Sequence, residues 1–195
     1  MAEIFLAKSF TGVGAERHCA IKRILPALSS DDSFGEMLIN EAKLCSGLSH
    51  ANIVQTYDLG KAEDLYYIAM EYVEGFDLNK LLGLLSKTKI AFPLEFALYI
   101  VVQVLNGLDY AHRKEDGDGN PLGVIHRDVS PQNVLISYEG EVKIIDFGIA
   151  KARQRLVQTQ AGVIKGKFRY MSPEQASGGK VDHRTDIFAA GVVLY

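Results

Sequence analysis

The sequence has 195 residues, of which 48% are hydrophobic and 23% charged, with a formal net charge of -3 at pH 7. This is the profile of a soluble globular domain, and its mild acidity argues against nucleic acid as the main partner, because nucleic-acid-binding proteins usually present a basic surface. No apolar run approaches the ~18 residues of a membrane-spanning helix, and Met1 does not open a secretory signal. Cys19 and Cys45 each lie in an apolar pattern, which favours reduced core residues over a disulfide.

The first 73 residues read mostly as strands. Short β runs extend from Ala2 to Lys8, from His18 to Ile24 and from Leu65 to Glu71. A helix is predicted between the second and third runs by a capping box and by apolar residues at spacings of four and three: Ser33, Glu36, Phe34, Leu38, Cys45 and Leu48.

Glu41 falls on the apolar face of this predicted helix. A buried carboxylate needs a cation, because leaving it unpaired costs several kcal/mol. Lys22, in the strand residues Ala20-Ile21-Lys22, is the candidate partner. The alternatives are a surface glutamate that interrupts the apolar face and a lysine at a solvated strand edge.

Residues 78–115 change to helical periodicity. Pro93 opens a strongly apolar helix that is predicted to be buried along one face: Leu94, Leu98, Val101, Leu105, Leu108 and Ala111. The acidic segment from Asp116 to Pro121 briefly resembles a calcium loop. It lacks the glycine at position six and the glutamate at position twelve, which are Pro121 and Arg127, so we interpret it as a turn.

Two short apolar strands, Val134–Ile136 and Val142–Ile145, are predicted to form a hairpin around a turn at residues 138–141. Asp128 and Asn133 precede the first strand, and Asp146 follows the second. Because a hairpin brings its outer ends together, these three side chains should converge. Two carboxylates and an amide suit a hard cation better than a core.

The spacing H-R-D-x-x-x-x-N from His126 to Asn133, followed by D-F-G from Asp146 to Gly148, resembles the catalytic and metal-binding pair of the eukaryotic-like protein kinase family. Ala20–Lys22 resembles the A-x-K of that family, and Ser172–Glu174 is a variant of its A-P-E. The sequence segments VSPQNVLI and MSPEQA are most similar to those of bacterial serine/threonine kinases.

The resemblance implies an α+β, two-lobed fold. Residues 1–73 would form the small lobe and hinge, with an antiparallel sheet and one helix, and residues 74–195 would form an incomplete, mainly helical large lobe. The chain begins in a strand-like run and stops in a helical one. Since a whole catalytic domain needs roughly 250 residues or more, we expect truncation at both ends.

The family's activity would be transfer of the ATP γ-phosphate, with Mg²⁺, to a Ser or Thr hydroxyl of a protein substrate. Asp128 would take the hydroxyl proton, Asn133 and Asp146 would hold the metal, and Lys22, fixed by Glu41, would orient the nucleotide. Adenine and ribose contacts are expected from Ile4, Ala20, Met70, Glu71, Val73, Asp77 and Leu135. For Asp77, a helix N-cap is an equally good interpretation.

The basic, weakly periodic segment from Ala150 to Ser172 corresponds to the family's activation segment. Thr159 is its candidate phosphosite, with an unmodified loop threonine as the alternative, and Arg127 would be one partner for the phosphate. Asp186 resembles the buried acid that braces the catalytic loop.

Three departures bear on activity. Ala2 stands where the last glycine of the phosphate-covering loop is usual, Ser130 replaces a catalytic-loop lysine, and Lys167 stands where serine/threonine members place threonine. Lys165 or Lys167 are candidates to compensate for Ser130. The leading interpretation is a cytoplasmic serine/threonine kinase without a membrane segment in this chain, a membrane anchor outside it staying open. The alternative is a pseudokinase or ATP-binding scaffold. We expect the isolated piece to be marginally stable and poorly active, with no basic partner for Glu174.

Overall fold

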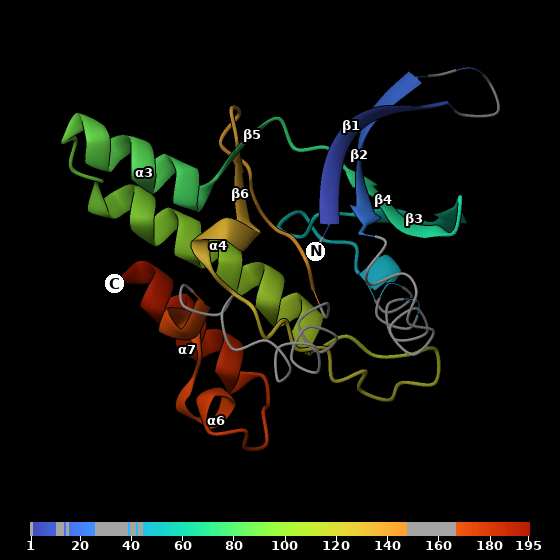
Figure 1. Ribbon diagram of the computed structural model, residues 1–195. Coiled ribbons are helices and arrows are strands. Elements are labelled where there is room, and N and C mark those ends of the chain that lie inside the picture. The colour runs from blue at the N-terminus through green and yellow to red at the C-terminus, as the bar shows by residue number, and fades with distance from the viewer. Residues whose placement is uncertain are drawn as a thin grey trace. The chain divides into compact units, whose positions relative to one another are not determined.

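The computed structural model describes residues 2–10, 14, 16–25, 39, 42, 45–147 and 167–195, without the side chain of Lys167. The chain divides into two compact units (Figure 1). Unit 1 contains Met1–Ser49 and Val54–Val73, and unit 2 contains His50–Ile53 and Glu74–Tyr195. Each unit is described by itself below.

Unit 1 is built on an antiparallel sheet in the order β1-β2-β4-β3. Its strands are β1 (Ala2–Phe10), β2 (Glu16–Ile24), β3 (Thr56–Ala62) and β4 (Leu65–Glu71). The predicted strands in β1, β2 and β4 are confirmed. Of the predicted helix between residues 33 and 48, Ile39, Ala42, Cys45 and Ser46 are described and helical.

Unit 2 holds a second antiparallel sheet in the order β5-β6-β7, with strands β5 (Gly75–Asp77), β6 (Val134–Ser137) and β7 (Val142–Ile144). β6 and β7 form the predicted hairpin, in register Val134 to Ile144. Gly140 supplies the positive φ of 86° that the turn requires. The strand ends at Ile144, one residue earlier than predicted.

The helices of unit 2 are α3 (Leu78–Thr88), α4 (Leu94–His112), α6 (Pro173–Ala176) and α7 (Arg184–Leu194). Two 3₁₀ turns, η1 (Pro131–Asn133) and η2 (Lys167–Tyr170), complete the described elements. α4 packs against α7 and β7 (Figure 1), and Leu108 of α4 is fully buried. Together the two sheets and the helices confirm the predicted α+β class.

The buried face of α4 differs from the prediction. Val101, Leu108 and Ala111 are buried as expected, but Leu94 and Leu98 are 65% and 46% exposed. Ile100 and Val104 take their place in the core. The prediction failed at the first turns because helical spacing shows which residues share a face, not which partner covers it. By length and composition α4 could cross a membrane; it packs on α7 and β7, and 33% of its most apolar 18-residue window is buried.

The His50–Ile53 segment lies in sequence between the two stretches of unit 1 but packs in unit 2. The Asn52 amide Nδ2 donates to the Gln103 side chain at 3.0 Å and to the Val142 carbonyl at 2.9 Å. The Asn52 carbonyl accepts from the Ile144 N–H at 2.9 Å. Gly107 permits this approach, because a Cβ there would lie 3.0 Å from the Asn52 carbonyl oxygen. The segment thus closes the free edge of β7.

Candidate active site

The hairpin brings the predicted catalytic residues together at its outer end. Asn133 ends η1 directly before β6, and its Nδ2 donates to the backbone carbonyl of Asp128 at 2.7 Å and to the Asp128 Oδ2 at 3.1 Å. The backbone N–H of Ile145 donates to the Asn133 carbonyl at 3.0 Å. Asp146 is the residue directly after Ile145, so it lies next to the backbone bond to Asn133.

The orientation of the Asn133 amide matters for metal binding. Its nitrogen is used by Asp128, and its Oδ1 accepts no hydrogen bond within the part of the chain that the structure describes. Asn133 Oδ1 and the Asp146 carboxylate are hard oxygen ligands of the kind that Mg²⁺ prefers. The described residues hold no cluster of three or more His, Cys, Asp or Glu side chains suited to a metal. Asn133 Oδ1 and the Asp146 carboxylate are therefore two oxygen donors of the kind that a hard cation accepts from protein side chains.

His126 is fully buried and joins the catalytic loop to the end of β7. Its Nδ1 accepts from the Asp128 N–H at 3.2 Å, so the ring proton must reside on Nε2. Nε2 then donates to the Ile145 carbonyl at 2.8 Å. The Phe147 ring packs edge-to-face on the imidazole, with centroids 4.6 Å apart. A neutral His126 thus fixes the backbone on both sides of the site.

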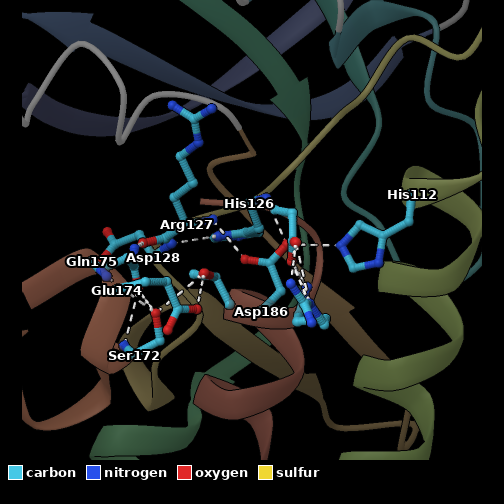
Figure 2. Close-up of polar contacts among 11 residues, drawn as sticks. His112, His126, Arg127, Asp128, Ser172, Glu174, Gln175 and Asp186 are labelled. Atoms are coloured by element: carbon cyan, nitrogen blue, oxygen red, sulfur yellow. Dashed lines mark hydrogen bonds and ion pairs between the residues drawn. The ribbon is translucent and has the colours of Figure 1, made fainter. Parts of the chain in front are cut away.

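Asp186, on the first turn of α7, is the acid that braces this loop, as predicted (Figure 2). It is fully buried, and its Oδ1 accepts from the Arg127 N–H at 2.7 Å. Its Oδ2 accepts from the His126 N–H at 2.8 Å and from His112 Nε2 at 2.8 Å. Three donors, two of them backbone groups about sixty residues away, satisfy a carboxylate that burial would otherwise destabilise.

Positive φ angles mark both sides of the site. Arg127 and Asp146 each have φ of 66°, a conformation that non-glycine residues rarely adopt. Figure 2 shows the Arg127 side chain extending away from Asp186 while its backbone N–H is bonded to that carboxylate. Its Nε is buried and has no hydrogen-bond partner among the described residues. Backbone strain held in place by surrounding bonds is a feature of functional sites.

The segment that follows η2 is bonded to the same loop. Ser172 is the N-cap of α6 in a capping box with Gln175, whose Nε2 donates to the Arg127 carbonyl at 2.9 Å. Thr185 Oγ1 donates to Glu174 Oε1 at 2.7 Å and lies 3.2 Å from Ser172 Oγ. The Thr185 hydroxyl is the main cause that lowers the pKa of Glu174. Glu174 therefore has a hydroxyl donor within unit 2. The sequence analysis expected only that it would lack a basic partner.

In unit 1, the strand register gathers the predicted nucleotide residues on one face of the sheet. Ile4 lies directly opposite Lys22, and Ala20 lies directly opposite Met70. Ala20 and Lys22 are two apart on β2, so all four share a face. Lys22 is only 4% exposed and lies on a strand paired on both sides, which rules out the solvated edge position. The backbone N–H of Glu71 donates to the Gln55 carbonyl at 2.8 Å.

Two further predicted residues meet in unit 2. Asp77 and Leu135 are directly opposed in the β5–β6 pairing. Asp77 also caps α3, since its Oδ1 accepts from the Lys80 N–H at 2.8 Å, which confirms the capping interpretation. Glu41, Thr159 and Lys165 lie outside the described residues. Val73 is half-buried, and Ser130 is buried with a hydroxyl that has no partner among the described residues.

Comparison with known proteins decides the family. The protein kinase domain family matches residues 7–195. The chain belongs to the protein kinase family. Its catalytic loop, D-F-G residues and bracing acid lie in the order that this family shares.

Similar kinases are bacterial. A tyrosine-protein kinase, MasK of Myxococcus xanthus, is 50% identical over 195 residues. Serine/threonine-protein kinase PrkC of Bacillus subtilis is 37% identical over 195 residues. The whole chain is matched in both cases, but it spans only 30% and 28% of their lengths.

A solved structure has the same fold. The kinase domain of Mycobacterium tuberculosis PknI aligns with the whole chain with a TM-score of 0.74 at 29% identity, and the chain covers 67% of that domain. The expected kinase-like fold, with an antiparallel sheet in the amino-terminal part and helices in the remainder, is confirmed. The chain represents part of such a domain.

Sequence reasoning missed three residues whose side chains bond within or next to the candidate site. His112 carries no pattern of its own, because it is an ordinary polar residue at a helix end. Thr185 directly precedes Asp186 in the sequence and likewise carries no pattern of its own. Gln175 could have been found, since Ser172 followed three residues later by Gln175 has the spacing of a capping box.

Proposed function

We propose that this chain is part of a protein serine/threonine kinase that transfers the γ-phosphate of ATP to a protein hydroxyl. The observation that carries the proposal is the contact of Asp128 with Asn133, next to Asp146, at the outer end of the β6–β7 hairpin. Phosphoryl transfer needs little covalent chemistry from a protein, so positioning and neutralised charge at one small site are sufficient.

The roles follow from the contacts. Asp128, oriented by the Asn133 amide, accepts the proton of the substrate hydroxyl. Asn133 Oδ1 and the Asp146 carboxylate hold Mg²⁺, which supplies charge neutralisation at the phosphates when bound. His126, His112 and Asp186 are positioning residues, because their contacts fix the backbone of the loop that carries Asp128.

Each unit contains residues that we propose as nucleotide contacts. In unit 1, Lys22 orients the phosphates with Glu41, and Ile4, Ala20 and Met70 line the adenine on the shared sheet face. At the end of β4 the Glu71 N–H is already bonded, so Glu71 would offer its carbonyl oxygen and Val73 its N–H. In unit 2, Leu135 would contact the adenine, and Asp77 would contact the ribose with the carboxylate that also caps α3.

Arg127 and Thr159 form the proposed regulatory pair. The buried Arg127 Nε without a described partner supports a role in binding an added phosphate. Phosphorylation of Thr159 would supply that group. Protein substrates are the partners, and the buried Cys19 thiol supports a reducing, cytoplasmic location. A membrane anchor elsewhere in the whole protein is compatible with this location.

The acceptor class has two candidates. Serine or threonine is supported by the relatives named serine/threonine kinases at 37% identity and by the VSPQN and MSPEQ sequence motifs. Tyrosine is favoured by the relative named a tyrosine-protein kinase at 50% identity, and by Ser130 and Lys167 in place of the usual lysine and threonine.

Radiolabelled phosphate transfer from ATP with magnesium tests the proposal, using the full-length protein and its Asp128→Asn variant. Labelled acceptors are hydrolysed in acid to identify the modified residue. We expect phosphoserine or phosphothreonine, and a loss of at least about a hundredfold in the variant. Phosphotyrosine alone would transfer the assignment to the tyrosine class. Intact ATP binding without transfer would identify a pseudokinase.

A further inference from the structure

Three aromatic side chains from three elements form an exposed surface on unit 2. Phe76 of β5, Tyr99 of α4 and Tyr138 of the β6–β7 turn are 38%, 48% and 66% exposed. The Phe76 and Tyr138 rings meet edge to face, with centroids 5.3 Å apart. The Tyr99 hydroxyl donates to the Gly140 carbonyl at 3.1 Å, two residues beyond Tyr138. The three rings are therefore joined through one turn.

Four exposed glutamates lie close in sequence to these aromatic residues. Glu139 and Glu141 lie in the turn itself, and Glu74 precedes β5. Glu95 lies four residues before Tyr99, so it projects from the same face of α4. None of these carboxylates forms an ion pair or side-chain hydrogen bond with another described residue. We call Phe76, Tyr99, Tyr138 and these four glutamates the aromatic–acidic face.

Bonds within the turn hold this face in one conformation. The Tyr138 N–H donates to the Glu74 carbonyl at 3.0 Å, and the Gly140 N–H donates to the Ser137 carbonyl at 3.0 Å. The Glu141 N–H donates to Ser137 Oγ at 3.0 Å. A ligand would therefore meet a preformed surface and lose little affinity to ordering it.

We propose that the aromatic–acidic face binds an arginine-containing segment of a protein substrate. Aromatic faces and carboxylates both attract cations, so their combination selects a basic side chain over a neutral or acidic one. Arginine fits better than lysine, because its planar guanidinium stacks on a ring and binds a carboxylate in a bidentate manner. That the partner is a substrate rests on the proposed kinase function.

The position of the face suits substrate docking. Asn133 precedes β6 and Tyr138 follows it, so the four residues of the strand separate the catalytic loop from the face. At about 3.3 Å per residue this is a separation of roughly 15 Å. An extended linker of about five residues spans that distance, and binding at the face would raise the local concentration of an acceptor hydroxyl near Asp128.

Direct binding is tested without nucleotide, using a fluorescein-labelled peptide of alternating arginine and leucine and the full-length protein. We expect the Glu139→Lys/Glu141→Lys variant, and separately Tyr138→Ala, to weaken binding about tenfold in fluorescence anisotropy. The control Glu63→Lys/Asp118→Lys changes the net charge equally at exposed positions elsewhere and should leave binding within about twofold. A lysine peptide should bind more weakly and a glutamine peptide should not bind.

Equal weakening by the control variant would overturn the proposal, because it would reduce the effect to net charge. Equal binding of the glutamine and arginine peptides would also overturn the proposal, because binding would then depend on apolar contacts and not on charge. A dimer in sedimentation velocity that Tyr138→Ala dissociates, with unchanged peptide binding, would make the face a contact between copies and also overturn it.

A kinetic measurement separates this proposal from the proposed function. The same acceptor peptide is compared with and without the arginine–leucine segment attached through a glycine–serine linker. We expect the segment to lower KM at least about fivefold, and Glu139→Lys/Glu141→Lys to remove that gain without changing kinetics on the untailed acceptor. Absence of phosphate transfer to both acceptors would count against the kinase function. Docking would then be decided by the anisotropy measurement alone. Equal KM values would overturn docking alone.

Discussion

The sheet of unit 1 and the catalytic loop of unit 2 are held in place by different kinds of bond. β1 and β2 pair over a continuous antiparallel register from Ala2–Ile24 to Phe10–Glu16, so backbone groups supply most of the contacts. The loop from His126 to Asn133 is irregular and depends on individual side chains, above all Asp186. Single substitutions should therefore be tolerated in the sheet and damaging in the loop.

The largest expected effect is at Asp186. Asp186→Ala would leave the His126 and Arg127 N–H groups buried without an acceptor, and we expect a loss of about 3–5 kcal/mol in the free energy of unfolding. Urea denaturation of the full-length protein measures it. The matched sheet variant is Glu3→Gln, which breaks the exposed pair with Arg23 across β1 and β2, and it should lose less than about 1 kcal/mol. Equal losses would show that the loop depends on single side chains no more than the sheet does.

A smaller effect is expected where α4 meets the His50–Ile53 segment. Gly107→Ala gains helix propensity, but its Cβ would lie 3.0 Å from the Asn52 carbonyl oxygen and 3.1 Å from Ile144 Cδ1. Since overpacking commonly costs about 1–3 kcal/mol and the propensity gain is below about 1, we expect net destabilisation of about 1 kcal/mol. The control Gly83→Ala on α3 has open space and should stabilise by about 0.5–1 kcal/mol. If both Gly107→Ala and Gly83→Ala stabilise the protein, the His50–Ile53 segment can shift to accommodate the added methyl group at little cost.

Thr185→Val tests the bonds behind Glu174, and we expect it to lower Tm at neutral pH by about 2–4 °C. The Thr185 hydroxyl lowers the pKa of Glu174 from its ordinary value of 4.5, so the associated stability is complete above that pH. It is lost as the pH falls through the lowered pKa. The Tm difference between wild type and variant should therefore shrink toward about pH 3.

The control for this pH series is Thr88→Val. Thr88 is an exposed helix threonine whose hydroxyl donates to backbone carbonyls and not to a carboxylate. Its Tm difference from wild type should stay constant across the same pH range. A constant difference for Thr185→Val as well would refute the assignment of the pKa shift to the Thr185 hydroxyl.

The smallest effect is expected at Ser130. Its buried hydroxyl has no hydrogen-bond partner among the described residues, so Ser130→Ala removes no known bond and should change the free energy of unfolding by less than about 0.5 kcal/mol. If Lys165 or Lys167 compensates for the missing catalytic-loop lysine, Ser130→Lys should change turnover little. A large rise in phosphate transfer would reject compensation. A tenfold loss in Ser130→Ala, with stability unchanged, would place this hydroxyl against the reacting groups.

The sequence predicted the periodic parts of the molecule well. Strand alternation located β1, β2 and β4, and the turn at Gly140 located the β6–β7 hairpin, because these signals are local. The approach of Asn133, before β6, to the residues that follow β7 was predicted from hairpin geometry. The brace at Asp186 depended instead on the family resemblance, since no local pattern links it to His126.

What the sequence could not predict depends on partners distant along the chain. The spacing of Leu94 and Leu98 matched a buried face, yet both are exposed, because burial is decided by what packs against a helix. The assignment of His50–Ile53 to unit 2 depends on bonds to Val142 and Ile144. The contact of His112 with Asp186 joins two helix ends that sequence separates by 74 positions.

The His50–Ile53 segment also sets an order of events during synthesis. Asn52 donates to the carbonyl of Val142, which is 90 residues later in the chain. At about 5–20 residues per second, a ribosome needs roughly 5–20 s to make that stretch. Throughout this interval the segment lacks its partners in β7, although the strands on both sides of it in the sequence have already been made. Nascent chains paused before residue 142 should therefore be sensitive to proteases near Asn52, and this sensitivity should disappear once β7 has left the ribosome.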